Sequence, residues 1–380
     1  MRFTRINFSN WRNFRKVEIK LQKRAFIVGP NAAGKSNLLD AFRFLQDIAS
    51  VGGGLQQAVN KRDGVSKIRC LAARRAPQVI LEIDIGANDS ENPDWTYRLE
   101  IVQDRASKPV VEKEIVERFG EVILSRPDKE DESDPERLRQ THLEQVNANK
   151  QFREISEFLN TVRYLHIVPQ LVREPDRSTG KVNDPYGGDF LERLARTPKS
   201  TLESRLNKIR TALRVAVPQL KDLELVRDNR GTPHIQGLYE HWRPNAGWQT
   251  EDQFSDGTLR LLGLLWSVLE GTGPLLLEEP ELSLHPELIR HVPQMFARLS
   301  RKRGRQVFIS THSGDLLQDS GIDANEVLLL LPSYDGTRVI TAQDDDQIVA
   351  LLENGDLSIA DAVLPRTSPS NASQIALFGD

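Results

Sequence analysis

The sequence predicts an α/β fold with a mixed sheet and an antiparallel β-meander, and three observations carry this prediction. Residues 25–28 are predicted to form a buried strand that runs into a glycine-containing loop and then into an amphipathic helix over 38–48. Apolar residues alternate with polar ones over 79–85 and 95–101, which indicates half-buried strands of an antiparallel arrangement. Residues 137–160 have a helical pattern, which indicates a helical insertion.

The remaining elements are predicted from shorter patterns. Residues 2–8 and 17–21 are expected to form strands ahead of the buried one, because apolar residues recur in both. Residues 125–136 are highly charged and contain two prolines, so we expect an exposed linker there. Further strands are expected over short apolar runs, namely 121–124, 162–168, 223–226, 275–277, 307–310 and 327–331. Further helices are expected over 190–213 and 258–270.

The composition excludes several classes of protein. The 380 residues carry a formal net charge of −3, so the chain has no bulk attraction to nucleic acid or to an anionic membrane. The single cysteine, Cys70, excludes an internal disulfide and fits a reducing compartment. The N-terminus lacks the apolar core of a signal peptide, and the apolar runs are too short to span a bilayer. We therefore expect a cytoplasmic protein without a membrane partner.

The loop after residues 25–28 has the pattern G-x-x-x-x-G-K-S. Its glycines allow a tight turn in which successive amides point at one concavity, and the following helix adds its unpaired N–H donors. Lys35 is expected to reach the β- and γ-phosphates of a nucleotide, and Ser36 to hold a magnesium ion. The predicted nucleotide-binding residues of this segment are Gly29, Pro30, Asn31, Ala32, Ala33, Gly34, Lys35, Ser36 and Asn37.

A second predicted group lies far along the chain, where the buried strand 275–277 ends in Glu278 and Glu279. Nucleotide hydrolysis needs one carboxylate for the magnesium shell and one for the attacking water. Glu278 is the expected magnesium-side acid and Glu279 the expected catalytic base. Two solvated acids at the end of a strand would be the simpler interpretation of this segment alone, but the upstream phosphate loop favours the catalytic one.

Two further segments are candidates for contacts with phosphate. His312 follows the buried strand 307–310, where an imidazole is able to sense a γ-phosphate. Ser255 and Gly257 precede an apolar helix, whose N-terminus suits an anion. The alternatives are a turn histidine bonded to the backbone and an ordinary helix N-cap at Ser255 or Asp256.

Together these motifs resemble the ATPase heads of the ABC superfamily, and above all the soluble branch of SMC proteins, RecF-type repair ATPases and overcoming-lysogenisation-defect (OLD) ATPases. GPNAAGKS, residues 29–36, matches the Walker A loop, and LLLEEPELSLHP, residues 275–286, resembles the Walker B strand and D-loop. Residues 254–257 are similar to the ABC signature and 310–312 to the switch-histidine segment.

Two weaker likenesses complete the set of motifs. Asn10-Trp11-Arg12-Asn13-Phe14 resembles the short motif in which, in these heads, an arginine lies close to the nucleotide, which implies this role for Arg12. Pro169-Gln170 occupies the place of the Q-loop, which implies Gln170 as a metal ligand. Two departures from the family pattern are Glu278 in place of the Walker B aspartate, as in the OLD-like branch, and Ser-Asp-Gly in place of Ser-Gly-Gly at 255–257.

The resemblance implies a P-loop NTPase fold of the ABC type that uses ATP and Mg²⁺. It implies one domain over residues 1–380, with lobe I at 1–124, a linker and helical insertion at 125–230, lobe II at 231–331 and a C-terminal extension at 332–380. It also implies a homodimer or higher homo-oligomer, in which Ser255 and Gly257 of one copy contact the γ-phosphate at the Walker A loop of another.

Two functional classes are open, and both begin from ATP binding and hydrolysis. The first is a sensor and scaffold that acts with a separately encoded effector in bacterial anti-phage defence, because residues 332–380 are too few for the TOPRIM nuclease of many OLD proteins. The second is a RecF-like repair ATPase that binds DNA through a cluster of cations, namely Arg298, Arg301, Lys302, Arg303 and Arg305. The alternative interpretation of these cations is the solvated end of a helix. A third, weaker class is an assembly module with negligible turnover.

Overall fold

The computed structural model describes residues 1–73, 76–87, 93–174, 184–243, 247–353, 357–368, 374 and 376. The chain forms two compact units. Unit 1 consists of Met1–Arg163, Thr272–Leu276 and Pro293–Asp380, and unit 2 of Tyr164–Gly271 and Leu277–Val292. The chain therefore passes between the units several times, and one of these passages lies within the strand that ends in Glu278.

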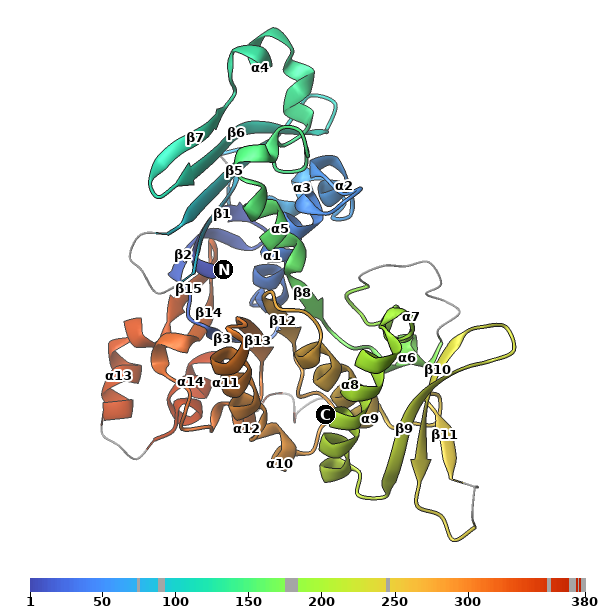
Figure 1. Cartoon of the computed structure of the whole chain (residues 1–380). Coiled ribbons are helices and arrows are strands. Elements are labelled where there is room, and N and C mark those ends of the chain that lie inside the picture. The colour runs from blue at the N-terminus through green and yellow to red at the C-terminus, as the bar shows by residue number, and fades with distance from the viewer. Residues whose placement is uncertain are drawn as a thin grey trace. The chain divides into compact units, whose positions relative to one another are not determined.

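The first sheet of unit 1 is the predicted antiparallel meander (Figure 1). Its strand order is β2-β1-β4-β5-β6-β7, and each neighbouring pair is antiparallel. One face is buried, as the alternation predicts. The strands are β1 (Arg2–Trp11), β2 (Phe14–Lys20), β4 (Val79–Gly86), β5 (Trp95–Gln103), β6 (Pro109–Arg118) and β7 (Glu121–Arg126). Strand β6 was not predicted, because charged residues interrupt its alternation.

The second sheet is mixed and contains the strand that feeds the phosphate loop. Its order is β15-β14-β3-β13-β12-β8, with β3 (Arg24–Val28) buried along its whole length. Strands β13 (Val307–Thr311) and β14 (Val327–Ser333) flank β3 in parallel, and β15 (Gly336–Thr341) joins β14 as an antiparallel edge. The edge strand β15 was not predicted, whereas β3, β13 and β14 were. The other two strands are β12 (Leu275–Glu278) and β8 (Arg163–Leu165).

An aromatic cluster joins the two sheets of unit 1 through helix α1 (Lys35–Ala49). The ring of Phe42 on α1 lies 4.8 Å from that of Phe3 on β1 and 4.9 Å from that of Phe308 on β13. Phe158, on α5 (Arg153–Thr161), lies 4.9 Å from Phe3. Offset and edge-on aromatic pairs of this kind stabilise a core beyond the area they bury. This cluster holds the middle of α1 between the two sheets.

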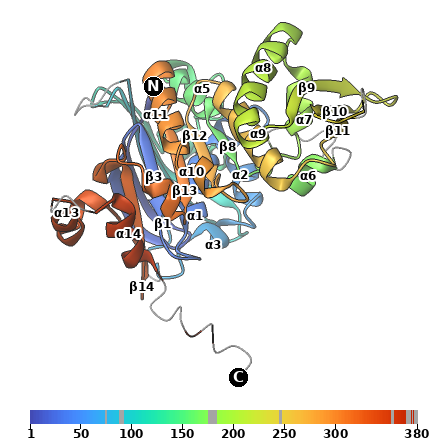
Figure 2. The same cartoon turned by 90° about the horizontal axis from the view of Figure 1, so that it is seen from below.

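Shorter helices complete unit 1. Helix α14 lies beside β14, and α13 lies next to α14, as Figure 1 and Figure 2 show. Only part of the expected helix over 137–160 forms an α-helix, because residues before α5 form two 3₁₀ turns. These turns are η1 (Pro135–Arg139) and η2 (Asn149–Gln151), and the helices are α2 (Leu55–Asn60), α3 (Val65–Ile68), α4 (Lys129–Ser133), α11 (Val292–Arg303), α12 (Gly314–Leu317), α13 (Asp346–Glu353) and α14 (Ile359–Thr367).

Unit 2 combines helices with a three-stranded antiparallel sheet of order β11-β10-β9. The expected helix over 190–213 is two helices, because Pro198 has no N–H to donate and disfavours helical backbone in the residue before it. Among the described ranges, no helix is long and apolar enough to cross a membrane. The elements of unit 2 are α6 (Pro169–Arg173), α7 (Phe190–Arg196), α8 (Lys199–Ala216), β9 (Leu220–Arg227), β10 (Pro233–Tyr239), β11 (Trp248–Thr250), α9 (Asp256–Leu269) and α10 (Pro286–Ile289).

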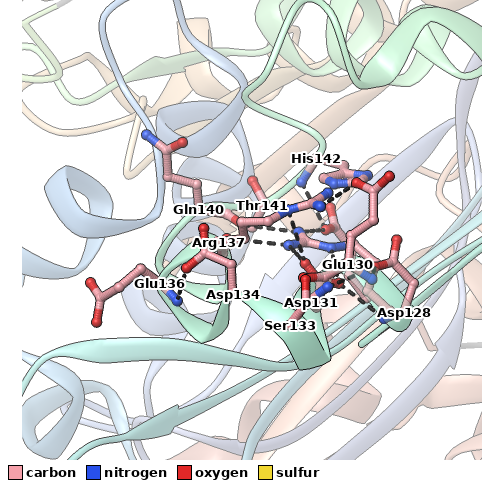
Figure 3. A network of polar contacts seen from close by, with 12 residues as sticks. Asp128, Glu130, Asp131, Ser133, Asp134, Glu136, Arg137, Gln140, Thr141 and His142 are labelled. Atoms are coloured by element: carbon pink, nitrogen blue, oxygen red, sulfur yellow. Dashed lines mark hydrogen bonds and ion pairs between the residues drawn. The ribbon is translucent and has the colours of Figure 1, made fainter.

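The segment 125–136, which we expected to be an exposed linker, contains a buried ion-pair network (Figure 3). The guanidinium of Arg126 donates to both oxygens of Asp131, at 2.9 and 2.8 Å, and to Glu114 at 3.0 Å. All three side chains are fully buried. The predicted exposure holds for most of the segment and fails at Arg126 and Asp131, because these charges pair with each other, with Glu114 and with backbone groups, which allows them to leave water.

The pKa of Asp131 follows from these contacts. Burial raises the pKa, but the hydrogen bonds from Arg126 outweigh burial and lower it from 3.8 to about 2. A carboxyl with a lowered pKa stabilises the fold above its unfolded-state pKa. This contribution is lost as the pH falls from about 4 through about 2.

Replacing Arg126 with methionine should therefore lower the free energy of unfolding by about 3–5 kcal/mol, because Glu114 and Asp131 would remain buried without their cation. Urea unfolding at neutral pH measures this loss. The matched control is Arg139→Met, which removes a partly exposed arginine that pairs with Glu136 and Asp104 and should lower the free energy of unfolding much less than Arg126→Met does. Equal losses of unfolding free energy in the two variants would show that the buried network stabilises the fold no more than a surface ion pair does.

Candidate functional site

The phosphate loop of unit 1 leaves the sheet at the end of β3. Val28 pairs with Thr311, so the loop and the segment after β13 emerge at the same edge of the sheet. The loop backbone is left-handed at Ala32, with φ 62°, and at Gly34, with φ 99°. Glycine adopts this conformation without strain, whereas alanine does so at a cost. Helix α1 begins immediately afterwards, at Lys35.

Lys35 is buried inside the loop that precedes it. Its Nζ donates to the carbonyls of Gly29, at 3.2 Å, and Pro30, at 3.4 Å, and it also contacts Nε2 of His312. The structure therefore brings together two of the predicted site residues, Lys35 and His312, from segments far apart in the sequence. An ammonium held by loop carbonyls is well placed to exchange them for phosphate oxygens.

The other loop residues differ in their surroundings. Asn31, Ala32 and Ser36 are exposed, whereas Ala33 is buried. Gly29 packs against β14, because a Cβ added at Gly29 would lie 2.8 Å from the Cβ of Leu330. This close approach requires glycine, so the first glycine of the motif has a packing role in the sheet as well as its predicted role toward a nucleotide.

Arg12 lies in the turn between β1 and β2, where its backbone is left-handed, with φ 53°. Its guanidinium pairs with Asp40 of α1 at 3.1 Å. Burial raises the pKa of Asp40, but the hydrogen bonds from Arg62 and the charges of Arg62, Arg43 and Arg12 outweigh burial and lower it. The predicted role of Arg12 beside a nucleotide stays a prediction.

Asn13 was not selected as a site residue from the sequence, although it belongs to the same short motif. Its Nδ2 donates to the carbonyl of Ala33 at 2.7 Å, and its Oδ1 accepts from Asn37 at 2.8 Å. The indole of Trp11 donates to the carbonyl of Asn37, also at 2.7 Å. The start of α1 is thus supported by the turn that follows β1. The Asn-Trp-Arg-Asn spacing was the available signal.

The acidic segment belongs to unit 2. Glu278, at the end of β12, accepts a hydrogen bond from the Tyr164 hydroxyl, and the imidazole Nδ1 of His166 lies 3.3 Å from the Glu278 carbonyl. Glu279 follows with a left-handed backbone, φ 44°, which costs a non-glycine residue about 1–3 kcal/mol. Gln170 is exposed on α6. That Glu278, Glu279 and Gln170 act on the ligand of Lys35 stays a prediction.

The predicted signature segment has local explanations in unit 2. Ser255 is the N-cap of α9, and its Oγ accepts from the amide of Thr258 at 3.2 Å. A Cβ on Gly257 would lie 2.5 Å from the carbonyl oxygen of Ser283, so this glycine is required by packing. Asp256 pairs with Arg173 at 2.6 Å. The contacts of Ser255 and Gly257 with a second copy's γ-phosphate stay predictions.

Comparison with known proteins adds to this description. The family model described as "AAA domain, putative AbiEii toxin, Type IV TA system" matches residues 24–319. Among curated proteins, the chain is similar to Endonuclease GajA of Bacillus cereus (strain VD045), with 33% identity over 104 residues. The match covers 27% of this chain and 16% of GajA, so the chain spans only a small part of that relative.

Solved structures of SMC heads resemble the whole architecture. The SMC head bound to the C-winged helix domain of ScpA has a TM-score of 0.55 at 13% identity, covering 90% of this chain and 98% of that one. The Pyrococcus furiosus SMC head with an extended coiled coil, bound to the C-terminal domain of ScpA, has a TM-score of 0.50 at 13% identity, covering 93% and 99%. At such identities the likeness shows the fold alone.

The family match includes the phosphate loop, the acidic strand and His312, and it extends through both units. The fold, with its mixed sheet and antiparallel meander, is that of a P-loop ATPase head of the ABC type. The chain therefore belongs to the family described as "AAA domain, putative AbiEii toxin, Type IV TA system", and its fold is that of an SMC-type ATPase head.

Proposed function

We propose that this chain binds ATP with Mg²⁺, hydrolyses it in the cytoplasm, and uses the cycle to close and open a homodimer. The observation that carries the proposal is the buried Lys35, whose ammonium contacts two loop carbonyls and His312. Lys35 lies at the start of α1, directly after the loop, where the charge of its ammonium would bind the phosphates of a triphosphate. His312 is then the γ-phosphate sensor.

The residues fit both ATP and Mg²⁺. The left-handed Gly34 and the exposed Ser36 at the start of α1 suit a phosphate with a bound metal ion. Glu278 offers the hard oxygen ligand that Mg²⁺ prefers, with Gln170 as a further ligand. When bound, the metal ion stabilises charge on the transferring phosphoryl group. Glu279 orients or deprotonates the attacking water.

We further propose that the ATP-bound dimer acts as a sensor and scaffold with a separately encoded effector in bacterial anti-phage defence. The likeness to Endonuclease GajA supports this role, and so does the resemblance to OLD-like ATPases. Only 16% of GajA is matched, so no nuclease activity is transferred to this chain. In the dimer, Ser255 and Gly257 of one copy would complete the γ-phosphate site of the other.

A RecF-like DNA-binding repair ATPase is the second candidate function. The observation in its favour is a cluster of exposed cations at the end of α11, namely Arg298, Arg301, Lys302 and Arg303. Arg305, which we had counted with them, is buried and donates to the carbonyl of Gly273 at 2.7 Å, so it is withdrawn from this surface.

Glu279→Gln should bind ATP, fail to release phosphate and accumulate as a dimer, because the amide keeps the shape of the base without its proton affinity. Size-exclusion chromatography with saturating ATP and a phosphate-release assay measure both properties. Lys35→Ala is the control that should bind ATP weakly and stay monomeric. A Glu279→Gln protein that remains monomeric with ATP bound would contradict dimer closure.

Tyr164→Phe should raise the Mg²⁺ concentration for half-maximal ATP turnover by about tenfold, because Glu278 loses the hydroxyl that orients its carboxylate. Phosphate release as a function of Mg²⁺ at fixed ATP measures the shift. The matched control is Tyr186→Phe, since Tyr186 packs edge-on against His166 but is exposed and makes no hydrogen bond to Glu278 among the described contacts. An unchanged Mg²⁺ dependence in Tyr164→Phe would argue against Glu278 as a metal ligand.

A salt titration of duplex DNA binding separates the two functions. A repair ATPase that uses the α11 cations should show a log–log slope of about −3 to −4, since each neutralised phosphate releases roughly one counterion. Charge reversal at Arg298 and Arg301 should then flatten the slope. A scaffold for a protein effector should bind duplex DNA weakly, with no loss on charge reversal.

A further inference from the structure

The turn between β1 and β2 touches three separate parts of unit 1 through one side chain. Both hydrogens of the Asn13 amide are used, one toward the carbonyl of Ala33 and one toward Oγ1 of Thr337, each at 2.7 Å. The amide oxygen accepts from Asn37 at 2.8 Å. The three partners of this amide lie in the phosphate loop, in α1 and in β15. Together they allow it only one orientation.

The fit of Asn13 against the loop is close. A Cβ on Gly34 would lie 2.2 Å from Nδ2 of Asn13, so the second glycine of the motif provides the room that this side chain occupies. Gly34 also has the left-handed backbone that turns the chain into α1. The conformation of the loop and the position of Asn13 therefore depend on each other.

The hairpin of β14 and β15 is attached to the same turn by its backbone. The amide of Thr337 donates to the carbonyl of Asn13 at 2.8 Å, and Asp335 pairs with Arg15 at 2.7 Å. A Cβ on Gly336 would lie 2.7 Å from the Asn13 carbonyl oxygen. Thr337 is buried at this contact. The hairpin thus contacts Asn13 through both side chain and backbone, in addition to the contacts that Asn13 makes with the loop.

We propose that Asn13 is a positioning residue for the nucleotide, which sets the phosphate loop by linking Ala33 and Asn37 to Thr337 of the β14–β15 hairpin. This inference rests on the proposed function, since the loop is taken as the site that holds the phosphates. It assigns the hairpin, which lies outside every nucleotide motif in the sequence, to the support of that site.

Asn13→Asp is the sharpest test, because it keeps the shape of the side chain and removes both donors. A carboxylate facing the Ala33 carbonyl should weaken the binding of fluorescent MANT-ADP by roughly tenfold, as expected when a buried donor becomes a repulsive contact. Thr337→Val, which removes one partner only, should weaken binding by a smaller factor.

Asn10→Asp is the matched control, since Asn10 lies in the same segment and donates to the carbonyl of Gln78 at 2.8 Å, away from the loop. It makes the same chemical change and should alter MANT-ADP affinity by less than about twofold, with a comparable fall in thermal stability. The inference is overturned if Asn13→Asp binds like wild type, or if Asn10→Asp weakens binding as strongly.

Hydrogen exchange of the nucleotide-free proteins separates this inference from the proposed function. Amides of residues 33–37 should exchange faster in Asn13→Asp than in wild type or Asn10→Asp, because the loop has lost its support. A wild-type protein that binds no nucleotide would defeat the proposed function, while the exchange rates would still decide the role of Asn13. Equal exchange in all three proteins would reject that role.

Discussion

The parallel pairing of β3 with β13 and β14 is the constraint on which the rest of unit 1 depends. Strand β3 is buried along its whole length, so its register is fixed by neighbours on both sides. Because Val28 and Thr311 are partners, the phosphate loop and His312 leave the sheet at one edge. The contact between Lys35 and His312 follows from this register, although 277 positions separate the two residues.

The loop needs support beyond its own sequence. Ala32 has a left-handed backbone, and such a conformation persists only where the surroundings impose it. Leu330 of β14 lies against Gly29, and Asn13 lies against Gly34, so the loop is supported at both ends. The meander contributes one support and the mixed sheet the other. The antiparallel sheet therefore takes part in holding the loop, through the turn that contains Asn13.

Sequence patterns predicted the strands of the core well, because β3, β4, β5 and β13 have the uninterrupted or alternating apolar residues that burial requires. They failed where polar residues are buried in pairs. Segment 125–136 looks like solvent-exposed chain, yet Arg126 and Asp131 are fully buried, and only the tertiary partner Glu114 reveals why. The cluster of cations near the end of α11 was predicted with Arg305 as a member, but Arg305 is buried. Asn13 was missed because its partners are distant in sequence.

The segment 255–257, which departs from the resembled signature, makes contacts within this chain. These contacts decide how the roles of the signature can be assigned to its residues. Asp256 stands where a glycine is usual in the resembled signature, and it pairs with Arg173, which also donates to the carbonyl of Phe254. Gly257 is fixed by the carbonyl of Ser283 and Ser255 by its N-cap contact. Each of these residues thus has a sufficient reason to be present inside one chain. A role toward a second copy must therefore be tested by changes in assembly at unchanged stability, because loss of activity alone would not distinguish a broken helix start from a broken dimer.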